Sequence, residues 1–203
     1  MAIKVANNQS LTAITALPSG VSGGAMTLLA TETASSSATI SFTSDIDDTY
    51  DEYVFRFYDI HPGTDDVKLT FQANAAGGSG YNETISSTSF GAVHDEANTT
   101  AQVAYVAAGD QAQGTSFQQL SSNSSIGADN DQSLSGYLHL FNPSSTTFVK
   151  HFISRTQFIS SSDFSVDDYH AGYFNTTSAI DEIQFKMSDG DIDAGVIKMY
   201  GVS

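Results

Sequence analysis

The chain has no cysteine and no tryptophan, only three prolines, and only seven lysines and arginines among its 203 residues. Without cysteine it can form neither a disulfide nor a thiolate metal site. Against 23 aspartates and glutamates, the few cations leave a formal net charge of −16. Such a charge repels phosphate backbones and anionic membrane surfaces. We therefore expect no nucleic-acid partner and no membrane partner.

Long apolar runs are also missing, since none approaches the roughly 20 residues that span a bilayer. Met1–Ser10 lacks a charged start followed by an apolar stretch, so it does not read as a secretory signal. We expect synthesis in the cytoplasm. What the chain does have is 40% hydrophobic residues, with 13 Phe and 9 Tyr, and this content excludes wholesale disorder.

Alternation of apolar and polar residues dominates from Met26 onward and predicts β-strands. Tyr53–Ile60 is apolar on both faces, which is typical of a central strand or of an oligomer face. No convincing helical period occurs, although residues 95–108 leave room for a short helical turn. The fold class predicted is all-β, an antiparallel β-sandwich of jelly-roll-like type with a short N-terminal arm. The other expected strands are 38–42, 67–73, 183–187 and 196–202, separated by loops at 76–80, 121–135 and 160–168.

Residues 1–25 form a separate region, ahead of a sandwich domain expected at 26–203. Leu11, Ile14 and Leu17 have weak helical spacing, but the segment is too short to be stable alone. We predict that these three residues anchor an arm to a partner or to the domain.

Gly136–Phe152 contains two apolar-rich runs on either side of Asn142-Pro143-Ser144-Ser145, a pattern that predicts a β-hairpin. His139 and His151 flank this turn. Two imidazoles without a third ligand are a weak metal signal, so we interpret them as a cross-strand packing pair.

Asp189, Asp191 and Asp193 alternate in an Asp-Gly-Asp-Ile-Asp-Ala-Gly run, and their carboxylates could hold Ca²⁺. The run departs from a helical calcium loop, because Ala194 replaces the required Gly and Tyr200 stands where a bidentate Glu belongs. The alternative interpretation is a polar turn between the last two strands. A bound Ca²⁺ is the only cofactor that the sequence suggests.

Tyr169, Tyr173 and Phe174 are expected in or near loops, where exposed rings could contact a partner protein or stack on a glycan. Core anchoring is the alternative for each ring. For catalysis the sequence offers no serine or cysteine in a nucleophile-elbow context. A glycosidase carboxylate pair is set in space and not in sequence, so a glycan-degrading enzyme stays an alternative.

Three segments resemble structural proteins of tailed bacteriophages, notably of phages that infect marine bacteria. The resemblance spans about residues 25–203, and it implies a small β-rich virion protein of tail-fibre-like or capsid-surface type, with no catalytic residue. The segments are Tyr50–Asp65, Gly136–Phe152 with the following Ile153–Arg155, and Ala179–Phe185 continuing through Gly195 to Tyr200–Gly201.

From the resemblance and the composition together we expect a non-enzymatic structural protein on the virion surface, a compact decorating, knob or fibre-adaptor subunit. Its arm would contact other virion proteins. Because Tyr53–Ile60 is apolar on both faces, we also expect a homo-oligomer, a trimer. The alternative function is a receptor-binding or carbohydrate-binding domain that contacts a host-surface glycan or receptor.

Overall fold

The structure is a computed structural model that describes residues 26–202 and contains thirteen β-strands and no helix in that range. All strand pairings in this range are antiparallel. The same residues include no helix that is long and apolar enough to cross a membrane. The strands are β1 (Thr27–Thr33), β2 (Ile40–Phe42), β3 (Glu52–Pro62), β4 (Leu69–Ala75), β5 (Ile85–Asp95), β6 (Ala101–Tyr105), β7 (Ala112–Gly114), β8 (Gln118–Gln119), β9 (Leu134–Phe141), β10 (Lys150–Ile159), β11 (Phe164–Phe174), β12 (Ile180–Met187) and β13 (Ile192–Val202).

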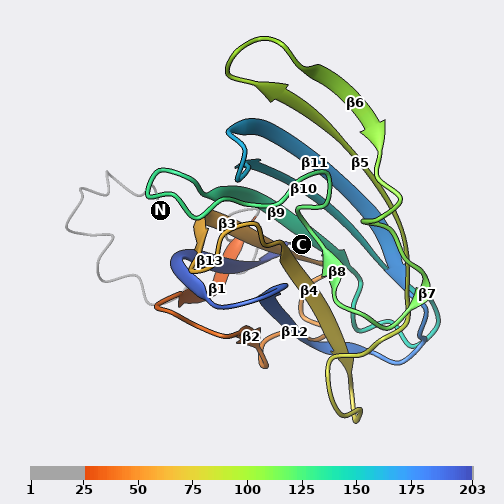
Figure 1. Cartoon of the computed structure of the whole chain (residues 1–203). Helices are drawn as coiled ribbons and strands as arrows, with labels where there is room; N and C mark the ends of the chain where they lie inside the picture. Colours follow the sequence, from red (N-terminus) through yellow and green to blue (C-terminus); the bar gives the residue numbers. More distant parts are fainter. Residues whose placement is uncertain (1–25, 203) are drawn as a thin grey trace, which may run out of the picture.

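Two sheets pack face to face, which confirms the predicted all-β antiparallel sandwich (Figure 1). The larger, nine-stranded sheet has the order β1-β13-β3-β9-β10-β11-β5-β6, with β7 also paired to β5. The smaller sheet has the order β2-β12-β4-β8. The β5–β6 hairpin ends the larger sheet, and its tip projects at the top of Figure 1, away from the smaller sheet.

Phenylalanine rings fill the space between the sheets. Phe185 of β12 is fully buried and lies at the centre, with its ring 5.3 Å from Phe57 and 5.4 Å from Phe55. Phe71 continues the cluster toward Phe152, at 5.1 Å. Because alternate residues of each strand point into this layer, one face of the larger sheet is committed to the core and the other faces outward.

Strand β4 is buried on both faces, which differs from the half-buried strand that its alternation predicts. Its apolar residues face the core, and its polar residues are covered by loops. The Nε2 group of Gln72 donates to three backbone carbonyls, those of Glu83, Thr115 and Ser116. A buried polar side chain is tolerated when it is hydrogen-bonded, and here its bonds hold the covering loops in place.

The hairpin predicted at Gly136–Phe152 is confirmed as β9 and β10, which pair from Leu134 with Phe158 to Leu140 with Phe152. The backbone N–H of Ser145 donates to the carbonyl oxygen of Asn142 across the turn, at 3.2 Å. Asn142 has a positive φ of 44°, a conformation that asparagine adopts more readily than most residues. The connection from 142 to 149 is longer than a tight turn.

Strand β3 is a central strand between β13 and β9, as its two-sided apolar pattern predicted. Tyr53, Phe55 and Phe57 are buried against the smaller sheet, and Val54, on the other face, is only 1% exposed. On that outward face Tyr58 is 44% exposed, so burial within the chain accounts for only part of the pattern that suggested an oligomer face. The trimer stays a prediction.

Two expectations of local structure change. Residues 95–108 contain the strand β6 between two hydrogen-bonded turns and no helix, and residues 160–168, expected as a loop, include the start of β11. Both strands pair with β5, β6 through a hairpin and β11 through a long-range contact. The predicted anchoring residues Leu11, Ile14 and Leu17 lie outside the described residues.

Candidate functional site

The outward face of the larger sheet carries one continuous row of aromatic and cationic side chains. The row crosses seven neighbouring strands, and each member is directly paired with the next by strand register. Directly opposed residues on one face have neighbouring side chains. From one end to the other the row is Tyr105, Phe90, Tyr169, Arg155, Tyr137, Arg56 and Lys198.

The rings and cations of this row contact one another. Phe90 stacks on Tyr169, with centroids 4.9 Å apart and an interplanar angle of 3°. The guanidinium carbon of Arg155 lies 5.0 Å from the centre of the Tyr169 ring, and that of Arg56 lies 5.5 Å from the centre of the Tyr137 ring. The two arginine contacts are at cation–π distances, so Phe90, Tyr169 and Arg155 form one ordered group in the row and Tyr137 and Arg56 form another.

The row gathers positive charge on an acidic protein. Both arginines of the chain, together with Lys198, lie in it, out of seven lysines and arginines in all. Arg155 donates to both carboxylate oxygens of Asp167, at 2.9 and 2.8 Å. These hydrogen bonds hold the pKa of Arg155 above its ordinary value, so this cation is fixed in place and charged.

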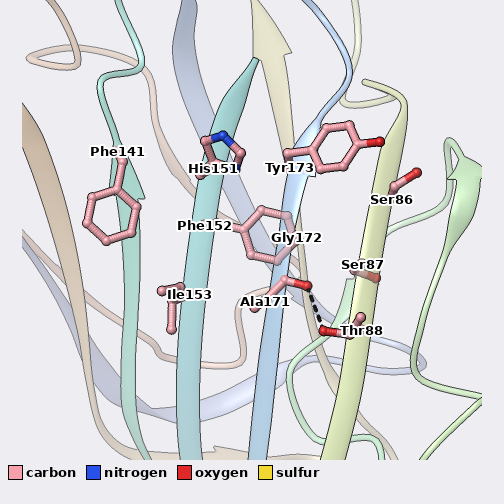
Figure 2. Close-up of a pocket in the computed structure, with 10 residues that line it drawn as sticks. All are labelled: Ser86, Ser87, Thr88, Phe141, His151, Phe152, Ile153, Ala171, Gly172 and Tyr173. Carbon is pink, nitrogen blue, oxygen red and sulfur yellow. Dashed lines mark hydrogen bonds between the residues drawn. The ribbon is translucent and has the colours of Figure 1, made fainter. Parts of the chain in front are cut away.

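A hollow of about 590 Å³ lies beside the row, over strands β9, β10, β11 and β5 (Figure 2). Small residues, Ala171 and Gly172, form its floor, and Figure 2 shows the rings of Phe141, His151 and Tyr173 grouped at one end. On the inner side of Gly172 the ring of Phe152 comes so close that an added Cβ would lie 2.7 Å from it. Glycine is therefore required there by close packing. The remaining lining residues are Ser86, Ser87, Thr88 and Ile153.

A second hollow of about 480 Å³ adjoins the first, and both are lined by Phe141 and His151. The β9–β10 connection forms its far side, where Phe148 is 68% exposed. Neither hollow is lined by an Asp, Glu, Lys or Arg among the described residues. The two hollows together form an uncharged groove with aromatic walls.

The hairpin histidines do not face each other across β9 and β10. His139 is directly paired with Ile153, and it hydrogen-bonds through Nδ1 to Glu52 of β3. His151 lies edge-on to Tyr173, at 6.1 Å between ring centres. The interpretation as a direct cross-strand pair is therefore wrong. Both are outward-facing residues, and His151 belongs to the groove.

The three predicted contact residues are separated by the fold. All three lie on strand β11 and not in a loop. Tyr169 is in the row and Tyr173 lines the first hollow, so both are on the outer face. Phe174 is fully buried and packs on Phe71 at 6.0 Å. Because successive strand residues point to opposite faces, Phe174 is a core residue, and its prediction as a contact is wrong.

Most of the outer-face residues were missed from the sequence, including Arg56, Arg155, Tyr137 and Phe90. For Tyr137, which precedes the alternating Leu138 and Leu140, position within the strand was the available signal. Arg56 lies in a run that is apolar on both faces, and Phe90 follows a buried serine, so alternation gave no signal for either residue. Parity shows that a side chain points outward. The alignment of seven strands into one row depends on sheet order and register, and neither could be read from local pattern.

The three aspartates proposed for Ca²⁺ lie at the β12–β13 hairpin and just inside β13. Asp193 accepts a hydrogen bond from the hydroxyl of Ser36, at 2.8 Å. Across residues 26–202, no three or more His, Asp or Glu side chains are grouped to hold a metal ion. Asp189, Asp191 and Asp193 are therefore not brought together as a ligand set, and Gly190, with a φ of 66°, fits the turn interpretation.

A buried polar cluster lies beneath β11. The Oδ2 atom of Asp168 accepts from the backbone N–H groups of Ser122 and Asn123, at 2.6 and 2.9 Å. The Nε2 atom of His170 lies 2.9 Å from the Ser122 hydroxyl oxygen. Burial raises the pKa of Asp168 to about 6 and lowers that of His170 to about 4. The carboxylate binds backbone groups and not the imidazole, so the cluster fastens the 121–123 segment to the sheet.

The chain was compared with family models, curated proteins and solved structures, and none of them matches it. Its function therefore has to be inferred from its own residues and geometry.

Proposed function

We propose that this chain is a non-enzymatic structural protein on the exterior of a tailed-phage virion, and that the outer face of its larger sheet attaches to a neutral saccharide of the host surface. The saccharide partner is proposed because an uncharged, aromatic-walled groove lies beside the aromatic row. The sequence left two alternatives for the exposed rings, contact with a partner protein and contact with a glycan. The groove favours the glycan.

Three properties of the groove suit a sugar. The rings of Phe141, Tyr173 and Phe148 offer flat apolar surfaces to the C–H face of a pyranose. Hydroxyls of Ser86 and Thr88 lie along the β5 side of the first hollow, with Ser86 directly beside Tyr173, and can bond sugar hydroxyls. A site of this kind, mostly apolar with a few polar groups, matches small-ligand sites in both volume and composition.

The charge of the chain favours a neutral ligand. A net charge of −16 repels anionic polysaccharides at long range, and neither hollow carries a cation that would compensate. Hydrolysis of a glycan uses a pair of carboxyl groups that flank the bond to be broken. The described residues that line the groove include no carboxyl group, so they support binding of a glycan and not its cleavage.

The three segments that carry the phage resemblance fit a scaffold role. They contain β3, the β9–β10 hairpin and the β12–β13 hairpin. Four of these strands, β13, β3, β9 and β10, are consecutive in the larger sheet and support the outer face.

Binding can be tested with a panel of neutral oligosaccharides in isothermal titration calorimetry. Tyr173→Ala should weaken binding at least about tenfold, equivalent to about 1.4 kcal/mol, because it removes a ring from the wall. The matched control is Tyr58→Ala, another exposed tyrosine of the outer face, which lines neither hollow. This variant should bind like the wild type.

The saccharide proposal fails if no neutral oligosaccharide binds, or if both tyrosine variants bind equally well. Binding that is stronger for acidic than for neutral saccharides would also contradict it. The virion location has a separate test, cryo-electron microscopy of intact particles. Density for the sandwich on the particle exterior is expected, and its absence from purified particles would overturn that part.

A further inference from the structure

The edge strand β6 is exposed along its whole length. All five residues, Ala101–Tyr105, are solvent-exposed, with Val103 at 75% and Tyr105 at 58%. One side of β6 is paired with β5, and the other has no strand beside it in residues 26–202. An open strand edge presents unpaired N–H and C=O groups that can pair with another strand.

Natural proteins protect such edges with charge, proline, bulges or short length. Of the edge strands in the two sheets, β2 has three residues and β8 has two. The opposite edge of the larger sheet, β1, carries Glu32 and an interrupted register between Leu28 and Ala30. These three edges are protected.

Strand β6 has none of these protections. Residues 97–109 contain no charged residue and no proline, although 15% of the chain is charged. The β5–β6 pairing runs in unbroken register from Phe90 with Tyr105 to His94 with Ala101. Among the edge strands of residues 26–202 that are longer than three residues, β6 is therefore the one without charge, proline or a break in register.

We propose that β6 pairs with β6 of a second copy of this chain, in antiparallel orientation and centred on Val103. Thr100 and Val106 form their hydrogen bonds toward β5. Since the bonding direction alternates along an antiparallel strand, Ala101, Val103 and Tyr105 direct their backbone groups to the open side.

A second copy of β6 matches this edge in length, charge and side-chain size better than an arbitrary strand does. With Val103 opposite Val103 of the second copy, all five residues of both strands are matched and no charges are opposed. Ala101 then lies opposite Tyr105 of the second copy, so that a small residue meets a large one. Two-fold pairing is also the commonest symmetry of homo-oligomers.

The dimer has a consequence for the outer face. A two-fold axis perpendicular to the sheet keeps the outer faces of both copies on the same side. The rows of the two copies then lie on the same face, offset from each other along the paired strands because Tyr105 is opposite Ala101, and the two grooves face one surface. Two linked sites raise the apparent affinity for a repetitive surface without any new contact to it.

Salt dependence separates this interface from one built on ion pairs. Each copy has a net charge of −16, so two copies repel at low ionic strength. Salt shortens the range of that repulsion to about 3 Å at 1 M, while backbone pairing at β6 is unaffected. Dimerisation should therefore strengthen with added sodium chloride.

The interface is tested on the full chain by light scattering over a concentration series. The wild type should reach twice the monomer mass at high micromolar concentration and high salt. Val103→Lys places two cations opposite each other and should leave a monomer. Val103→Thr keeps a neutral β-branched residue and should still dimerise. Leu28→Lys makes the same kind of change on β1 and should not affect the mass.

The absence of cysteine allows a direct check of register. In Val103→Cys the two thiols would lie within the reach of a short bis-maleimide, and covalent dimers should form rapidly. Leu28→Cys should cross-link only at the slow rate of random collision. A wild type that stays monomeric at high salt overturns the proposal. It is equally overturned if Val103→Lys still dimerises, or if Leu28→Cys cross-links as fast as Val103→Cys.

Discussion

Phe90 and Tyr169 lie face to face on adjacent strands, with ring centroids 4.9 Å apart and planes within 3° of parallel. Arg155, from the next strand, covers the same tyrosine ring at 5.0 Å. One register therefore aligns an aromatic pair and a cation across three strands. The same register holds the rest of the row in place.

A double-mutant cycle on Phe90→Ala and Tyr169→Ala should measure a coupling free energy of about 0.5–1.5 kcal/mol, the range for aromatic pairs. Chemical denaturation of the wild type, both single variants and the double variant gives this value. Tyr58→Ala combined with Tyr169→Ala serves as the control, and the two changes should be additive within about 0.5 kcal/mol. Additivity of the Phe90 and Tyr169 changes would show that the stacking contributes nothing.

Phe185→Ala should lower the free energy of unfolding by about 3–5 kcal/mol, because it leaves a cavity at the centre of the phenylalanine cluster. The ring is fully buried and lies within 6.3 Å of four other phenylalanine rings. Urea denaturation measures the loss. Phe148→Ala, at a site that is 68% exposed, should change stability by less than about 0.5 kcal/mol. Similar losses for both variants would contradict the core assignment.

Gly172→Ala should destabilise the chain by about 1–3 kcal/mol through overpacking. The added Cβ would lie 2.5 Å from the carbonyl oxygen of Ser86 and 2.7 Å from the ring of Phe152. Thermal unfolding compares this variant with Ala171→Ser, a change of similar size at the neighbouring residue, which faces the open hollow. A Gly172→Ala protein as stable as the wild type would show that β11 and β5 can separate without loss.

Asp168 and His170 make opposite contributions to the pH dependence of stability. The pKa of Asp168 is raised from 3.8 to about 6 in the folded chain, so its contribution is present at low pH and is lost as pH rises from about 4 through 6. The pKa of His170 is lowered from 6.5 to about 4, so its contribution is present above pH 6.5 and is lost as pH falls toward 4. In the wild type the two effects largely cancel between pH 4 and 6.

Removing either residue should expose the effect of the other. Relative to the wild type, Asp168→Asn should gain about 3 kcal/mol of unfolding free energy as pH rises from 4 to 6. His170→Gln should show the opposite slope, with a relative loss of similar size as pH rises from 4 to 6.5. Urea denaturation at a series of pH values measures both. Parallel pH profiles for the wild type and both variants would contradict the shifted pKa values.

The period-2 alternation of the sequence was sufficient to predict the β class and several strands. It works at 183–187, within β12, because that run has one face in the core, and a side chain in a strand can face only one of two ways. It fails at β6, whose five residues are all exposed. A strand with no buried face leaves no hydrophobic pattern, and β6 exists because β5 supplies its hydrogen bonds.

The candidate site divides in the same way. The sequence by itself determined the acidic charge, the absence of cysteine and the alternation of strands such as 183–187, because these follow from composition and from the geometry of one strand. Only the tertiary structure decided that Tyr169 and Tyr173 lie outward on β11, and that Phe90, Tyr137 and Arg155 join Tyr169 in one row. That alignment requires strands far apart in the chain to pair in a fixed register, which is set by packing of the whole inner face against the smaller sheet.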